Sequence, residues 1–169
     1  MTGTILLILV AVAVIAYFLG RSRAHALCGG DLSQLHSRPS YHGGFMAIFA
    51  TVPAFLLVLV WTGLAPGIED NIVSGSFETQ MADMSVPERQ AFIRDARSIA
   101  RGVTYGEPTP AKEAAAELFK SLSTRSATML SALVAALVFG GGWLAHRRLT
   151  PLLRTRHTVE RFVMITLVA

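Results

Sequence analysis

The sequence predicts an all-α integral membrane protein with three transmembrane helices, the start of a fourth, and a helical extracytoplasmic segment between spans two and three. Hydrophobic residues make up 52% of the 169 residues and charged residues only 15%, whereas soluble domains carry about 25% charged residues. No Asp, Glu, Lys or Arg occurs in residues 1–20, 39–68 or 126–146. Each stretch approaches or exceeds the ~20 apolar residues that cross a bilayer core.

The first predicted span covers residues 1–20. A cleaved signal peptide carries its positive charge before the apolar run, but here Arg21 and Arg23 follow it. Positively charged residues accumulate on the cytoplasmic side of membrane proteins. We therefore expect an uncleaved anchor with its N-terminus in the periplasm.

Residues 21–44 are predicted to form a cytoplasmic loop, and residues 45–65 the second span. Pro53 lies inside this span, and we expect it to kink the helix, because proline removes one backbone donor. Trp61 lies near the far end, as is typical of the aromatic belt at a membrane surface.

Residues 66–125 differ in composition and are predicted to form a periplasmic helical segment. They contain nine of the chain's 11 acidic residues and seven basic ones, a net charge of −2. Ser85-Val86-Pro87-Glu88 forms a capping box that begins one helix, and Gly102 is expected to end it. A second helix is expected to begin at Thr109-Pro110. No Gly or Pro interrupts residues 111–139, so this helix should continue into the third span.

The third predicted span covers residues 126–145. Its small residues recur every fourth position, a spacing that lets another helix approach closely. This predicted packing stripe consists of Thr128, Ala132, Ala136 and Gly140. The Gly140–Gly142 run could act as a hinge, but close helix packing is the favoured interpretation.

Two further segments follow the third span. Residues 146–161 form a predicted cytoplasmic Arg-rich linker, and residues 162–169 the truncated start of a fourth span. Because eight apolar residues cannot cross a bilayer, we expect the chain to be a piece of a longer polypeptide.

Arginines flank the spans on one predicted side of the membrane. The favoured interpretation is that they set the topology. The alternative is that they bind anionic lipid headgroups. Their position beside apolar spans argues against nucleic acid as a partner and for membrane lipid. These residues are Arg21, Arg23, Arg147, Arg148, Arg154 and Arg156.

Common catalytic and cofactor motifs do not occur in the sequence. There is no GxxxxGK[ST], GxSxG or HExxH pattern, and the single cysteine, Cys28, cannot form an intrachain disulfide. We therefore predict no catalytic, metal or cofactor site. The spans contain no acidic or basic residue, which argues against this region lining a transport path.

Several local patterns together resemble a known family. They are Gly20-Arg21-Ser22-Arg23-Ala24 after the first span, Leu35-His36-Ser37-Arg38-Pro39-Ser40-Tyr41-His42-Gly43 in the loop, and the Val159-Glu160-Arg161 entry to the last apolar run. The chain resembles the N-terminal region of the PstC-type permease subunit of bacterial phosphate ABC transporters. The loop positions that match this pattern are Gly29, Gly30, Leu35, His36, Ser37, Pro39, Tyr41, His42 and Gly43.

The resemblance implies a location in the bacterial inner membrane. It also implies three protein partners: a second permease subunit, an ATPase subunit and a periplasmic phosphate-binding protein. The chain would then be a non-catalytic accessory region that supports assembly or binding-protein docking. An alternative is the sensory module of a membrane receptor, because two spans around an extracytoplasmic helical segment suit that class too. A small membrane scaffold is a third possibility.

Overall fold

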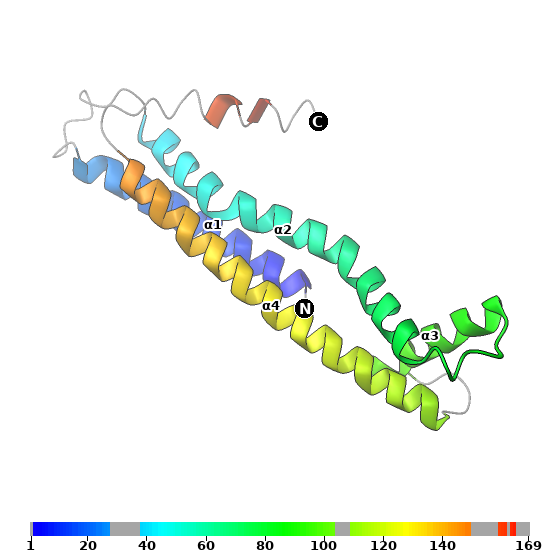
Figure 1. Ribbon diagram of the computed structural model, residues 1–169. Helices are drawn as coiled ribbons and strands as arrows, with labels where there is room; N and C mark the ends of the chain where they lie inside the picture. The colour runs from blue at the N-terminus through cyan, green and yellow to red at the C-terminus, as the bar shows by residue number, and fades with distance from the viewer. Residues whose placement is uncertain (1, 28–37, 104–108, 150–158, 162, 165–169) are drawn as a thin grey trace. The chain divides into compact units, whose positions relative to one another are not determined.

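The computed structural model describes residues 2–27, 38–103, 109–149, 159–161 and 163–164. Within these ranges every regular element is helical, so the predicted all-α class is confirmed. Three of the helices are long and apolar enough to cross a membrane. The four helices are α1 (Thr2–Leu27), α2 (Pro39–Ser76), α3 (Val86–Ala100) and α4 (Pro110–Arg148) (Figure 1).

The chain divides into two compact units. Residues 1–59 and 131–169 form one, here called the α1 unit, and residues 60–130 form the other, here called the α3 unit. Helices α2 and α4 contribute residues to both. The two units are described separately below.

Helices α2 and α4 are much longer than a bilayer requires. They contain 38 and 39 residues, which corresponds to about 57 Å each at 1.5 Å per residue, against a hydrocarbon core of ~30 Å. Helix α4 continues without a break from Pro110 into the apolar stretch, as the sequence predicted.

The helix ends differ from the predicted span ends. Helix α2 begins at Pro39 and ends at Ser76, whereas the predicted span covered only residues 45–65. Proline is well tolerated in the first turn of a helix, where its missing N–H has no partner to lose. Helix α1 likewise continues to Leu27. Hydrophobicity marks the part of a helix that lies in lipid, and the backbone can remain helical beyond it.

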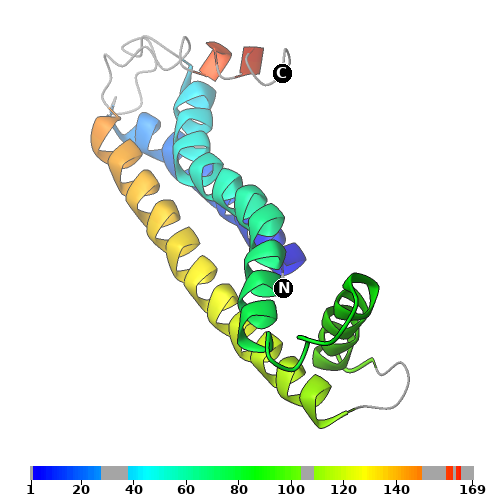
Figure 2. The same cartoon turned by 45° about the vertical axis from the view of Figure 1, so that its right-hand side comes forward.

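In the α1 unit, α1, the first part of α2 and the last part of α4 lie side by side (Figures 1 and 2). Most of the cluster that joins them consists of small or flexible side chains: Ala16, Phe45, Met46, Ala50, Ala145 and Leu149. Large apolar side chains point outward instead, with Leu7 73% exposed and Phe139 77% exposed. Such a surface is suited to lipid rather than water.

In the α3 unit, sequence-local hydrogen bonds define both ends of α3. The Ser85 backbone N–H donates to Glu88 Oε2 at 2.7 Å, and the reciprocal contact from the Glu88 backbone to the Ser85 side chain is present as well, which confirms the predicted capping box. At the other end Gly102 has φ +79°, and its N–H donates to Ile99 O at 2.9 Å. The Val103 N–H donates to Ser98 O at 2.9 Å. This pair of bonds is a Schellman motif.

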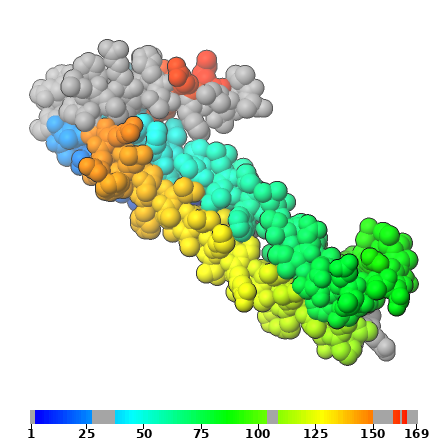
Figure 3. Space-filling model, viewed as in Figure 1, coloured from blue at the N-terminus to red at the C-terminus, as the bar shows by residue number. Residues whose placement is uncertain are grey.

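The core of the α3 unit is built from larger residues than that of the α1 unit. The end of α2, the turn before α3, the second half of α3 and the start of α4 contribute to it, and the space-filling view shows these segments in direct contact (Figure 3). Removing a large apolar side chain from water stabilises a fold by about 1.5–3 kcal/mol. These helices can therefore pack against one another without lipid. The buried residues are Val73, Met81, Phe92, Ala96, Ala115 and Phe119.

Candidate functional site

The loop positions that matched the family pattern are only partly within the described residues. Pro39, Tyr41, His42 and Gly43 lie in the first two turns of α2. The remaining five positions lie outside the described residues: Gly29, Gly30, Leu35, His36 and Ser37.

The described motif residues lie where α1 crosses α2. A Cβ added to Gly43 would lie 2.7 Å from Tyr17 O, and one added to Gly20 would lie 2.8 Å from His42 O. The two backbones therefore approach too closely for any other residue at either position. His42 is 1% exposed, and neither of its ring nitrogens has a hydrogen-bond partner.

Tyr41 connects this crossing to the segment that precedes the last apolar run. Its hydroxyl donates to Glu160 Oε1 at 3.4 Å, and Val159 packs on the same cluster of the α1 unit. The described motif residues thus hold backbone and chain segments of the α1 unit together.

The predicted packing stripe on α4 is exposed in this chain. Thr128, Ala132, Ala136 and Gly140 all lie on the solvent- or lipid-facing surface. The close contact with α2 falls on the neighbouring glycine instead, because a Cβ on Gly141 would overlap the carbonyl oxygen of Phe49. A Cβ on Gly140 would meet nothing within 4 Å.

The flanking arginines lie at helix ends rather than in loops. Arg21 and Arg23 are in the last turns of α1, and Arg147 and Arg148 end α4. The Arg147 guanidinium carbon lies 4.7 Å from the centre of the Trp143 ring, a cation–π contact. The other two predicted residues, Arg154 and Arg156, lie outside the described residues.

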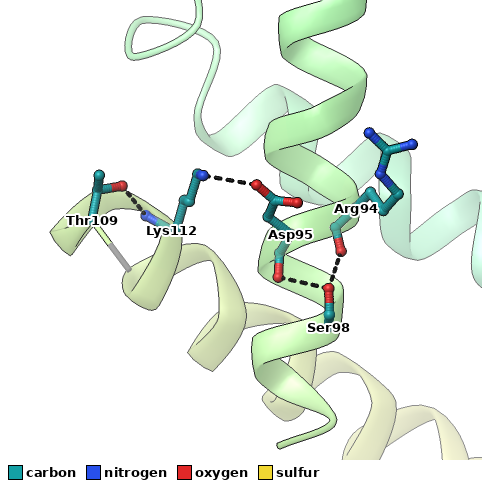
Figure 4. A network of polar contacts seen from close by, with 5 residues as sticks. All are labelled: Arg94, Asp95, Ser98, Thr109 and Lys112. Atoms are coloured by element: carbon teal, nitrogen blue, oxygen red, sulfur yellow. Dashed lines mark hydrogen bonds and ion pairs between the residues drawn. The ribbon is translucent and has the colours of Figure 1, made fainter. Parts of the chain in front are cut away.

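Two ion pairs hold α3 against its neighbours in the α3 unit. Asp95 pairs with Lys112 of α4 at 2.8 Å (Figure 4), and Arg97 pairs with Asp70 of α2. The Arg97 guanidinium carbon also lies 5.5 Å from the centre of the Phe119 ring. Both pairs join residues that are distant in the sequence, and hydrophobic patterning did not predict them.

Arginine side chains gather on one surface of α3. Arg94, Arg97, Ser98 and Arg101 line a surface hollow of about 330 Å³. A second hollow, of about 320 Å³, shares Arg94 and Arg97 with the first. In Figure 4 the Arg94 guanidinium points away from the Asp95–Lys112 pair. The i, i+3, i+7 spacing of these arginines is visible in the sequence, but hydrophobic patterning alone does not distinguish it from an ordinary solvated face.

In the α3 unit, the carboxyl group of Glu88 takes part in the capping box of α3. Hydrogen bonds from the Ser85 side chain, and then from its backbone, lower the pKa of the exposed Glu88 carboxyl below its ordinary value. These bonds favour the charged form. Within the described ranges no group of three His, Cys, Asp or Glu side chains is placed to hold a metal ion.

The fold and these contacts define a helical membrane protein in which the end of α2, α3 and the start of α4 pack as a second helical unit. A family model described as "Phosphate ATP-binding cassette transporter" matches residues 6–169, nearly the whole chain. The chain belongs to this family. No curated protein and no solved structure matches it.

Proposed function

We propose that this chain is the N-terminal accessory membrane region of a PstC-type permease in the bacterial inner membrane. The observation that carries the proposal is the family match over residues 6–169. The loop motif that ends in Tyr41-His42-Gly43 gives independent support. The region would assist ATP-driven phosphate import without itself performing catalysis.

The proposed topology places the N-terminus and the α3 unit in the periplasm. Arginines at the ends of α1 and α4 support this, because positive charge favours the cytoplasmic side. The Trp61 indole N–H donates to Ser126 Oγ at 2.9 Å. That bond joins the predicted outer end of span two to the predicted start of span three, as expected if both residues lie at one membrane surface.

The α3 unit is the part proposed to act, by supporting assembly with a second permease subunit or docking of the phosphate-binding protein. It has its own aromatic core and two ion pairs, so it offers a rigid surface. In the sensory alternative, α4 would continue as a long signalling helix. The sequence instead places only a short polar stretch, residues 146–161, before another apolar run, which favours the transporter proposal.

The test is to replace residues 77–109 with a short Gly/Ser linker in the full-length gene. We expect phosphate uptake to fall at least tenfold, or recovery of the permease with its partner subunits to be lost. A matched control carries Phe139→Ala, which changes only a side chain on the outer surface of α4. Unchanged uptake and assembly in the linker variant would contradict the proposal.

A further inference from the structure

The packing of the α3 unit accounts for Arg97, but it does not account for Arg94 and Arg101 on the same face of α3. Arg94, Arg97 and Arg101 are spaced by three and four residues, so they share one side of the helix. The two acids of α3 are engaged elsewhere: Glu88 binds Ser85, and Asp95 binds Lys112. Positive charge is therefore concentrated on one surface of a segment whose net charge is −2.

The three arginines are not neutralised together. Arg97 pairs with Asp70 and lies against Phe119, which fixes its position. Among the described residues, no ion pair involves Arg94 or Arg101, and both are exposed. The fixed guanidinium thus stands between two that are available to a ligand.

Helix capping does not account for these arginines either. Basic residues near a helix C-terminus can satisfy its last carbonyl groups. In α3 the carbonyls of Ser98 and Ile99 already accept hydrogen bonds from Val103 and Gly102, each at 2.9 Å. The guanidinium groups of Arg94 and Arg101 are consequently left for another acceptor.

We propose that Arg94, Arg97 and Arg101 form a binding site for a phosphate-type oxyanion. The hollow that they line with Ser98, of about 330 Å³, has room for a tetrahedral anion and its water. Guanidinium groups bind phosphate oxygens through paired hydrogen bonds. The site's location in the periplasm rests on the proposed function, whereas the binding itself does not.

Free inorganic phosphate and a phospholipid headgroup share this chemistry. The first arm of the test uses the protein in nanodiscs of zwitterionic lipid, titrated with inorganic phosphate in a calorimeter. The site variant carries Arg94→Gln and Arg101→Gln, and the matched control carries Arg125→Gln, an exposed arginine on α4. We expect the dissociation constant to rise at least tenfold in the site variant and to stay unchanged in the control.

The second arm measures phosphatidylglycerol retained by the protein in native mass spectrometry. If the bound anion is a lipid headgroup, inorganic phosphate does not bind in the first arm, and the site variant loses phosphatidylglycerol that the control retains. Loss of one anion from the site variant but not from the control supports the site and identifies which anion it binds. If neither anion binds selectively, or if site variant and control lose binding equally, the proposal is wrong.

A chemical measurement covers the case in which the site variant does not fold. Phenylglyoxal modifies accessible arginines, and mass spectrometry locates the products. With the anion identified in the binding arms present, modification of Arg94 and Arg101 should slow at least fivefold while Arg125 reacts as before. Equal rates at all three would overturn the site even if the uptake test supports the proposed function. Protection without an uptake defect would leave the site standing and the proposed function contradicted.

Discussion

The α1 unit and the α3 unit share two continuous helices but are held together in different ways. In the α1 unit, Gly43 and Gly141 allow backbones to touch, and large apolar side chains point outward. In the α3 unit, aromatic residues such as Phe119 are buried and ion pairs surround them. In lipid the hydrophobic effect does not bring helices together, so close packing must hold them. In water the hydrophobic effect favours the burial of large apolar side chains between helices.

The largest expected effect is in the α3 unit. Phe119 is 3% exposed, and Phe119→Ala should destabilise this unit by about 3–5 kcal/mol, because it removes a buried ring and leaves a cavity. Hydrogen exchange of the α3 amides should accelerate correspondingly. Phe139→Ala is the matched control, since that ring is 77% exposed. Similar exchange of α3 in the two variants would remove the distinction between the units.

A smaller effect is expected in the α1 unit. Gly141→Ala places a methyl group against Phe49 O, which should cost about 1–3 kcal/mol as overpacking. Gly140→Ala meets open space and should be neutral or stabilising, because alanine is the better helix former. The measurement is thermal unfolding in detergent. A greater loss in the Gly140 variant would place the helix contact on the predicted stripe.

The choice between Gly140 and Gly141 illustrates what the sequence could predict. Composition predicted three helices that are long and apolar enough to cross a membrane. The positions of Gly, Pro and capping residues predicted the capping box at Ser85 and the continuous helix from Pro110. Neighbouring residues differ by about 100° around a helix, so the face that meets α2 depends on the shape of α2. The extension of α2 to Ser76 was not predicted from the sequence. Polar residues mark where a helix leaves the apolar part of the membrane, but the backbone can remain helical beyond that point.

Within the candidate site the same limit applies. The Arg94, Arg97 and Arg101 spacing is a local pattern and was available from the sequence. The Arg97–Asp70 pair joins different helices, and only the folded chain brings these residues together. Local signals therefore located α3 and its ends, whereas the partners of its side chains required the structure.

A modest effect is expected from the ion pair between Asp95 and Lys112. Their side chains are 25% and 24% exposed, and partly exposed pairs contribute about 0.2–1 kcal/mol. A double-mutant cycle with Asp95→Asn and Lys112→Met should give a coupling energy in this range, falling at high salt. A coupling of zero at low salt would show that the pair does not stabilise the α3 unit.

The smallest effect concerns pH and the capping box. The pKa of Glu88 is lowered by hydrogen bonds from Ser85. A lowered folded-state pKa means that the stabilisation is present at neutral pH and is lost as pH falls through that pKa. NMR of the Ser85 amide should report this loss on acidification. Glu88→Ala should abolish the transition, whereas Glu117→Ala, on an exposed face of α4, should leave it unchanged.

Helix α2 is expected to pass from lipid into water along its length. Spin labels placed one at a time along α2, from Phe45 to Ser76, can report accessibility to oxygen, which concentrates in lipid, and to a water-soluble nickel chelate. We expect outward-facing sites before Trp61 to favour oxygen and those after Ala65 to favour the chelate. Continuous oxygen preference to Ser76, or chelate preference from Phe45 onward, would contradict the account.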